Sequence, residues 1–310
     1  MATYPLQRWV QIGAITTVLF VGGVGYAGGG STAAKNDSYS NASLLISGAE
    51  LARRLNEPGI RILDVRPAEQ YGTGHIPGAL NLTAAQITRS LNGIPGMLAP
   101  MSDVEQVLGE RGVGRETQVV IYDEIGGMSA TRLFWVLDFL GHSQISVLQG
   151  GYKVWEQERR LASREIPKLA TGRFNAQPRP DRLADKTWVQ AHLKDPSIII
   201  VDARSPEEFT GAVAGRDVKR PGHIPGAVNV DWILNLTETK PQQFKPSTEL
   251  ARLYREAGAT PEKEIVVYCR TGVRASHAYF VLRLLGFPRV RLYDGSYVEW
   301  SADPDLPVAR

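Results

Sequence analysis

The sequence predicts an α/β protein with two similar domains, each a parallel sheet with helices on both faces. Two observations lead to this prediction. Short, β-branched apolar runs alternate with longer amphipathic runs, as in parallel strands joined by helical crossovers. Several motifs of the first half also return in the same order in the second half, which indicates a tandem duplication. A length of 310 residues with 43% hydrophobic residues suits two globular domains.

The first 41 residues differ in composition from the rest of the chain. Arg8 precedes an apolar, small-residue run over 10–27, and a segment rich in Gly, Ser, Ala and Asn follows. This order is typical of a signal peptide or an uncleaved signal anchor, so we expect residues 1–41 to direct export, periplasmic or lumenal, or membrane attachment. The glycines and threonines make the run a weak membrane span. The alternative is a disordered tail with a chance apolar run.

Strands and helices alternate along the rest of the chain. The clearest predicted helices cover 133–137 and 279–285, each just before a glycine that suits a helix C-terminus. Between the halves, 164–185 is rich in Pro, Arg and Lys and lacks periodicity, so we expect an exposed linker that lies over both halves. The predicted domains are then 42–163 and 186–310. The predicted strands are 60–65, 119–122, 145–148, 198–201, 265–268 and 290–293.

The repeated motifs place the two halves in register. They include an Asp-x-Arg strand end, a His-Ile-Pro-Gly-Ala turn, a strand leading into a loop, and an ending with Tyr and Trp. In pairs they cover 62–71 and 200–209, 75–81 and 223–229, 119–123 and 265–269, and 150–155 and 295–300.

A single cysteine, Cys269, lies at the carboxyl end of the predicted strand 265–268. The helical stretch that follows directs backbone N–H groups and its positive dipole end toward this position, which favours a thiolate. Arg270 and Arg274 act in the same direction. We therefore expect an exposed, reactive thiol of low pKa. The alternative is a buried structural cysteine, the commoner fate of a lone one.

Two differences between the halves bear on function. Asp123 stands where the second half has its cysteine; a carboxylate repels anions and is no sulfur nucleophile, so we expect a catalytically silent first half. The second half has an insertion after Phe209, whose basic residues are Arg216, Lys219 and Arg220. Either this insertion lies over the active site and adds positive charge, or it is an ordinary surface loop.

With these motifs the chain resembles the tandem-domain rhodaneses, the thiosulfate sulfurtransferases, over nearly everything after the N-terminal segment. The Asp-x-Arg strand end, the His-Ile-Pro-Gly-Ala turn, the Cys-Arg-x-Gly loop and the Asp-Gly-Ser-Tyr-x-Glu-Trp ending carry the resemblance. It implies an inactive N-terminal half beside an active C-terminal half. It also implies that sulfane sulfur moves from thiosulfate to cyanide or a thiol through a persulfide on Cys269.

The resemblance assigns roles to the loop. Cys269 is expected to attack the outer sulfur of thiosulfate, form the persulfide and release sulfite. Asp202 and Arg204 either brace the loop or form an ordinary structural ion pair. The residues expected to bind the donor and the persulfide anion are Arg270, Thr271, Gly272, Val273 and Arg274.

Three comparisons with related enzymes bear on the substrate. The best-known thiosulfate enzymes have Lys at the position of Thr271 and Arg at the position of Glu208, which leaves Arg274 to replace lost positive charge. The mercaptopyruvate sulfurtransferases have Gly-Ser where this chain has Arg270 and Thr271. The phosphatase relatives have Cys-x5-Arg spacing, whereas four residues separate Cys269 from Arg274 here, which suits sulfur and is too tight for phosphate.

Two alternatives to a thiosulfate enzyme stay open. One is a 3-mercaptopyruvate sulfurtransferase, and the other is a non-enzymatic binding or sulfur-relay protein with an acceptor protein as partner. A net charge of +3 without long basic runs indicates no nucleic-acid partner. None of the five histidines lies at metal-ligand spacing from another His, Cys or carboxylate, so we expect neither metal nor cofactor.

Overall fold

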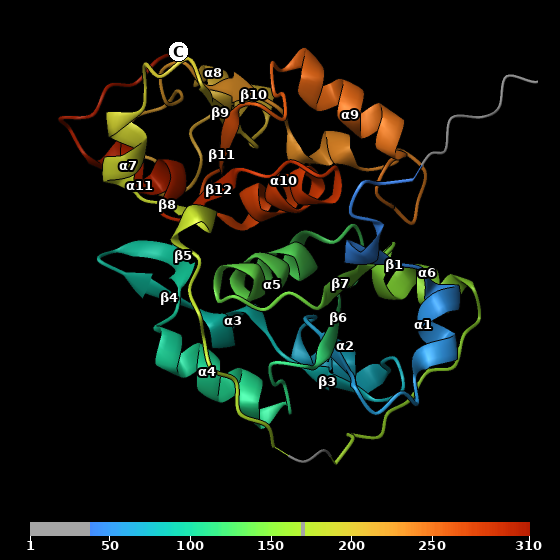
Figure 1. The fold of residues 1–310 in the computed structure, drawn as a ribbon. Coiled ribbons are helices and arrows are strands. Elements are labelled where there is room, and N and C mark those ends of the chain that lie inside the picture. Colours follow the sequence, from blue (N-terminus) through green and yellow to red (C-terminus); the bar gives the residue numbers. More distant parts are fainter. Residues whose placement is uncertain (1–37, 169–170) are drawn as a thin grey trace, which may run out of the picture. The chain divides into compact units, whose positions relative to one another are not determined.

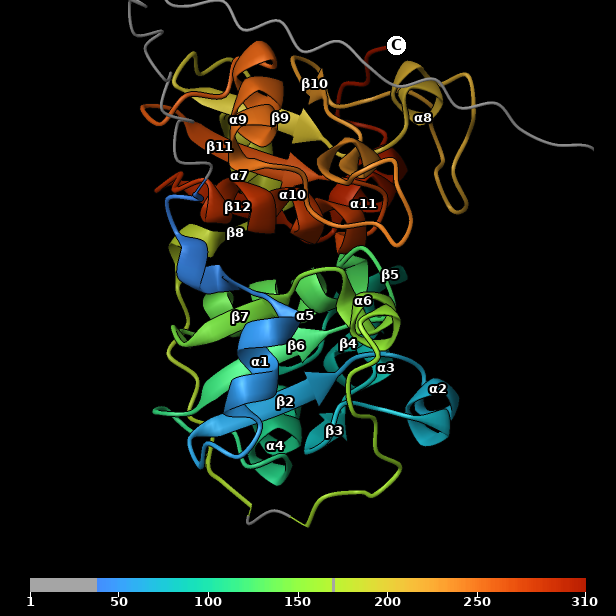
Figure 2. The same cartoon turned by 90° about the vertical axis from the view of Figure 1, so that its right-hand side faces the viewer.

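Each half of the chain folds around its own five-stranded parallel sheet (Figures 1 and 2). The structure, a computed structural model, describes residues 38–168 and 171–310. The first sheet has the order β1-β7-β6-β2-β3 and the second the order β10-β9-β11-β12-β8, so that β6 and β11 are equivalent central strands. The first sheet comprises β1 (Leu45–Ile46), β2 (Ile60–Asp64), β3 (Ala79–Asn81), β6 (Gln118–Tyr122) and β7 (Ile145–Leu148). The second comprises β8 (Leu183–Ala184), β9 (Ile198–Asp202), β10 (Val228–Asn229), β11 (Glu264–Tyr268) and β12 (Val290–Tyr293).

The helices of the two halves also correspond. In the first half they are α1 (Gly48–Arg54), α2 (Ala68–Thr73), α3 (Ala84–Ile87), α4 (Met101–Glu110), α5 (Met128–Phe139) and α6 (Gly151–Gln157). In the second half they are α7 (Lys186–Ala191), α8 (Pro206–Thr210), α9 (Ser247–Glu256), α10 (Val273–Leu284) and α11 (Ser296–Ala302). Short 3₁₀ turns occupy η1 (Ala42–Leu44), η2 (Pro180–Arg182) and η3 (Trp232–Asn235).

Strand residues alternate between two buried faces, as expected for sheets covered on both sides. In β11, Ile265 and Val267 face the central core, whereas Val266 and Tyr268 face a separate outer core beside α7 and α11. The central core is continuous between the halves, because the helices α5 and α10 pack against each other there. The predicted fold class is therefore confirmed.

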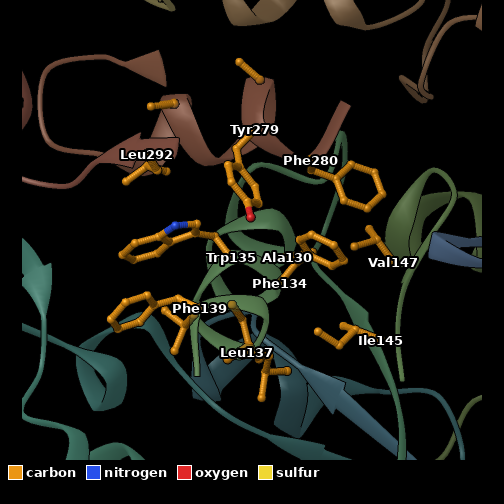
Figure 3. Close-up of a cluster of buried hydrophobic side chains, with 14 of the residues drawn as sticks. Ala130, Phe134, Trp135, Leu137, Phe139, Ile145, Val147, Tyr279, Phe280 and Leu292 are labelled. Carbon is orange, nitrogen blue, oxygen red and sulfur yellow. The ribbon is translucent and has the colours of Figure 1, made fainter. Parts of the chain in front are cut away.

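Figure 3 shows the centre of this shared core. Phe134 and Trp135 of α5 face Tyr279 and Phe280 of α10, and the rings of Phe134 and Phe280 meet edge to face with centroids 4.9 Å apart. The Tyr279 hydroxyl donates to the Asp138 carboxylate at 2.7 Å, which satisfies the polar end of this buried ring.

An antiparallel hairpin, β4 (Thr88–Leu91) and β5 (Ile94–Leu98), was not among the predicted elements. Strand β4 is polar and mostly exposed, and Pro95 and Gly96 interrupt the apolar residues of β5, so neither strand has the β-branched run that marks the other strands. The turn does carry a sequence signal: Asn92 and Gly93 both have positive φ, of 52° and 79°, as an Asn-Gly hairpin turn requires.

The segment between the halves is less exposed than predicted. Phe174 is buried among residues of the first half, and Leu183–Ala184 forms the edge strand β8 of the second sheet. The segment lies against both halves as predicted, but the prediction that it is exposed is wrong for these residues, because two short apolar stretches pack against the domains.

The predicted leader falls almost entirely on residues 1–37, outside the described residues. Within the described part of the chain, no helix combines the length and the apolar character that crossing a membrane requires.

Candidate active site

Cys269 directly follows β11, the central strand of the second sheet, and α10 begins four residues later at Val273. Gly272 makes this sharp connection possible with a φ of +81°. A Cβ on Gly272 would lie 3.0 Å from the Asp294 carboxylate and 3.0 Å from the Arg132 guanidinium. Only glycine therefore suits both the backbone conformation and the space at this position.

Backbone hydrogen bonds hold the loop against the start of α11. The carbonyl of Cys269 accepts from the Tyr297 N–H at 3.0 Å, and that of Arg270 accepts from the Val298 N–H at 3.1 Å. The Cys269 N–H donates to the Ser296 hydroxyl at 3.3 Å. Cys269 as a whole is only 1% exposed, so the expectation of an exposed thiol is wrong.

Arg274 is held by Glu208 of α8 in a bidentate ion pair. Its two terminal nitrogens donate to the two carboxylate oxygens of Glu208 at 2.6 and 2.9 Å. Burial raises the pKa of Glu208, but the hydrogen bonds and charge of Arg274 outweigh it and hold that pKa below its usual value. Arg274 therefore already has a carboxylate partner. The expectation that its charge replaces the cation missing at Thr271 or Glu208 is wrong in this simple form.

The insertion after Phe209 lies against the loop. Arg270 donates to the Arg216 carbonyl at 3.2 Å and has the Asp217 carboxylate 3.8 Å away. Arg220 is directed elsewhere, because its guanidinium binds carbonyls of the C-terminal segment, among them that of Leu306 at 2.7 Å. At the loop the insertion thus contributes a backbone carbonyl and a carboxylate, and the expectation that it adds positive charge there is not supported.

Asp202 and Arg204 form a buried ion pair with an N–O distance of 2.6 Å. Asp64 and Arg66 form the same pair at the same distance in the half that has no cysteine. This repetition favours the structural interpretation. The link to the loop is indirect: the Arg204 guanidinium stacks on the ring of Tyr297, 4.0 Å from its centroid, and Tyr297 holds the Cys269 carbonyl.

In the first half, the space inside the equivalent loop is filled by the side chain of Asp123, which belongs to that loop. The Asp123 carboxylate accepts three backbone N–H groups at the start of α5, from Gly127 at 3.1 Å, Ser129 at 2.9 Å and Ala130 at 3.2 Å. These are the donors that would otherwise be free for an anion. Burial raises the pKa of Asp123 to about 6, against the lowering effect of these three hydrogen bonds.

We expect Asp123→Asn to remove a pH-dependent loss of stability. A carboxyl whose pKa rises from 3.8 to about 6 binds its proton more tightly in the folded state, so stability falls as the pH rises from 3.8 to 6 and then levels off. A shift of this size corresponds to ~3 kcal/mol. Urea unfolding of wild type and of Asp123→Asn at pH 4 to 7 checks this. Taking the difference between their free energies of unfolding at each pH removes the contributions of the other titrating groups. A difference that does not vary with pH contradicts the prediction.

The β4–β5 hairpin of the first half contacts the active loop, which comprises residues 269–274. Leu98 of β5 donates its N–H to the Asp294 carboxylate at 2.8 Å, and Asp294 forms an ion pair with Arg132 of α5 at 2.7 Å. Arg132 also donates to the Gly96 carbonyl at 2.9 Å. A Cβ on Gly96 would lie 3.4 Å from the Thr271 carbonyl, so the hairpin touches the loop itself.

The second half makes the reciprocal contact with the Asp123 loop. His277 of α10 donates from Nε2 to the Gly126 carbonyl at 2.9 Å. Burial lowers the pKa of His277 to about 4, so the ring is neutral near pH 7. Phe244 packs against Gly127 and exchanges two backbone hydrogen bonds with the Gln149 amide. Each loop is therefore held by the opposite half.

The sequence interpretation missed Arg132, Asp294 and His277 as parts of the site's surroundings. A signal existed, because Arg132 and His277 occupy the same position when the two halves are aligned on Val136 and Val281. If the side chain at this position contacts the opposite half in one copy, the equivalent side chain of the other copy is expected to do the same.

Fold and site together define a protein of two α/β domains with one cysteine loop at the carboxyl end of a parallel sheet. The family model for the rhodanese-like domain matches twice, at residues 47–158 and 185–303. A thiosulfate sulfurtransferase of Azotobacter vinelandii is 35% identical over 272 residues, 88% of this chain and 99% of that relative. The 3-mercaptopyruvate sulfurtransferase of Escherichia coli K12 is 33% identical over 83% of this chain and 95% of its own length.

Solved structures agree with these matches. The 3-mercaptopyruvate sulfurtransferase SseA of Escherichia coli superposes with a TM-score of 0.74 at 30% identity and covers 82% of this chain and 98% of its own. The chain belongs to the rhodanese-like family, and within it to the sulfurtransferases, enzymes that move sulfur between small-molecule donors and acceptors.

Proposed function

We propose that this sulfurtransferase takes sulfane sulfur from thiosulfate onto Cys269 and passes it to cyanide or a thiol. The observation that carries the proposal is the difference between two equivalent loops: the second holds Cys269, and the first is filled by the Asp123 carboxylate. The first half, 42–163, is accordingly proposed to be silent, and the second, 186–310, to be catalytic, with 164–185 between them. The thiosulfate donor follows the Azotobacter vinelandii relative.

The reaction has two steps. The Cys269 thiolate attacks the outer sulfur of thiosulfate; a bond forms between the two sulfurs, the S–S bond of thiosulfate breaks, and its electron pair leaves with sulfite. The acceptor then attacks the terminal sulfur of the persulfide, takes it as thiocyanate or as a new persulfide, and returns the thiolate. Thr271 and the N–H groups of Gly272 and Val273 are proposed to stabilise the persulfide anion.

Two finer assignments belong to the same proposal. A relative named as a sulfur carrier protein, from Thermus thermophilus, is 32% identical over 88% of this chain, which supports a sulfur-acceptor protein as a further partner. Residues 1–41 are proposed to be a signal peptide or signal anchor that directs export or membrane attachment. Sequencing the N-terminus of the mature protein tests whether the leader is cleaved.

The test is the intact mass of the purified protein before and after exposure to thiosulfate. We expect a gain of one sulfur atom that cyanide reverses. The same measurement with 3-mercaptopyruvate tests the alternative donor, which the Escherichia coli relative supports and the residues Arg270 and Thr271 oppose. No gain with thiosulfate, in a folded protein with a free thiol, contradicts the proposed donor.

A further inference from the structure

Each cationic side chain of the active loop has a carboxylate beside it. Arg270 has Asp217 at 3.8 Å, and Arg274 has Glu208 at 2.6 Å. Burial raises the pKa of Asp231, and the positive charge of Arg274 partly offsets this rise. Arg274 is therefore largely neutralised by Glu208, whereas Arg270 has only a more distant and more exposed carboxylate beside it.

We propose that Glu208 determines donor specificity. Because Glu208 holds Arg274 in an ion pair, Arg274 is less available to bind a doubly charged donor. This inference rests on the proposed transfer of sulfur from thiosulfate. In this interpretation the charge of Glu208 limits the affinity for thiosulfate.

The geometry indicates a firm pair. The Arg274 and Glu208 side chains are only 22% and 13% exposed, and a bidentate, partly desolvated pair is much stronger than a surface one. Glu208 is also oriented from its own helix, where its side chain and that of Ser205 form a capping box. Gly215 of the insertion packs close by, since a Cβ there would lie 3.3 Å from the Glu208 carboxylate and 3.1 Å from Arg270.

The charge of the reacting groups explains why this pair matters. The Cys269 thiolate and thiosulfate together bring three negative charges to one buried loop. Burial lowers the pKa of Arg274, but the hydrogen bonds and charge of Glu208 and the negative charge of a Cys269 thiolate together raise it. Because charges interact strongly in such a partly buried site, a fixed carboxylate 2.6 Å from the main cation weakens the binding of a further dianion.

The decisive variant is Glu208→Gln. Glutamine keeps the shape and the capping oxygen but loses the charge, so helix α8 is retained. We expect kcat/KM for thiosulfate to rise about tenfold, chiefly through a lower KM, and the gain to shrink as salt is added. Asp231→Asn, which also keeps its cap on Ile233, is expected to act in the same direction with a smaller effect.

The matched control is Glu207→Gln. It removes the same charge from the neighbouring residue of the same helix, but Glu207 is exposed and has no hydrogen bond to Arg274. We expect less than a twofold change in KM, since an exposed charge is screened by solvent. An equal gain in this control, or an unchanged or lower kcat/KM in Glu208→Gln, overturns the inference.

A second readout separates this inference from the proposed function. Cys269 is the only cysteine, so alkylation reports on its surroundings whatever the natural donor is. Iodoacetate carries a negative charge and iodoacetamide does not; we expect Glu208→Gln to raise the ratio of their rates about tenfold. If wild type gains no sulfur from thiosulfate but this ratio rises, the donor is wrong and the role of Glu208 stands. A ratio equal to that of wild type refutes the role itself.

Discussion

Cys269→Ser is expected to abolish the gain of a sulfur atom from thiosulfate and to lower turnover by on the order of a thousandfold or more. A serine oxygen cannot form a persulfide, and the chain has no other cysteine that takes over the sulfur. Intact mass and thiocyanate formation measure the two effects.

The structure indicates that this loss is chemical and not structural. The loop is held by backbone groups of Cys269, through Ser296 and Tyr297, and serine keeps both contacts. We therefore expect the unfolding temperature to stay within a few degrees of wild type. Turnover that survives the substitution contradicts the assigned role of Cys269.

Arg132→Leu is expected to lower the free energy of unfolding by about 3 kcal/mol. The Arg132 and Asp294 side chains are only 2% and 5% exposed, so the substitution leaves a buried carboxylate with little compensation beyond the Leu98 N–H. Urea unfolding followed by tryptophan fluorescence measures the loss.

Arg89→Leu is the matched control. It breaks the ion pair of Arg89 with Asp103 in the same half, but both side chains there are about two-fifths exposed, at 41% and 42%. An exposed pair contributes less than about 1 kcal/mol, so this variant should remain close to wild type. Adding Asp294→Leu to Arg132→Leu should recover part of the loss, because it removes the unpaired charge. Equal losses for Arg132→Leu and Arg89→Leu would contradict the buried-pair explanation.

The sequence predicts the parts of the fold that depend on local periodicity. All six predicted strands are present, and their ends lie within about one residue of the predicted ends. They are predictable because their apolar, β-branched runs are buried on both faces of the sheets. The repeat also locates the loop of Cys269 and its counterpart at Asp123. Both features follow from residues close together in the chain.

What the sequence does not predict is the pairing of distant residues. Glu208 and Arg274 are 66 positions apart, and Arg132 and Asp294 belong to different halves. The pairing of carboxylates with arginines depends on how α8 and the insertion pack against the loop. The spacing of these residues in the sequence does not predict that packing. The burial of Cys269 likewise depends on packing against α11.

The reciprocal contacts of the two loops have the form of an isologous dimer interface enclosed in a single polypeptide. In such an interface the same surface serves both subunits, and any substitution acts twice. Here the two copies are encoded separately, so Arg132 and His277, or Asp294 and Gln149, are free to differ at equivalent positions. Covalent linkage thereby allows one loop to carry the Asp123 carboxylate and the other to carry Cys269, while both keep their contacts with the opposite half.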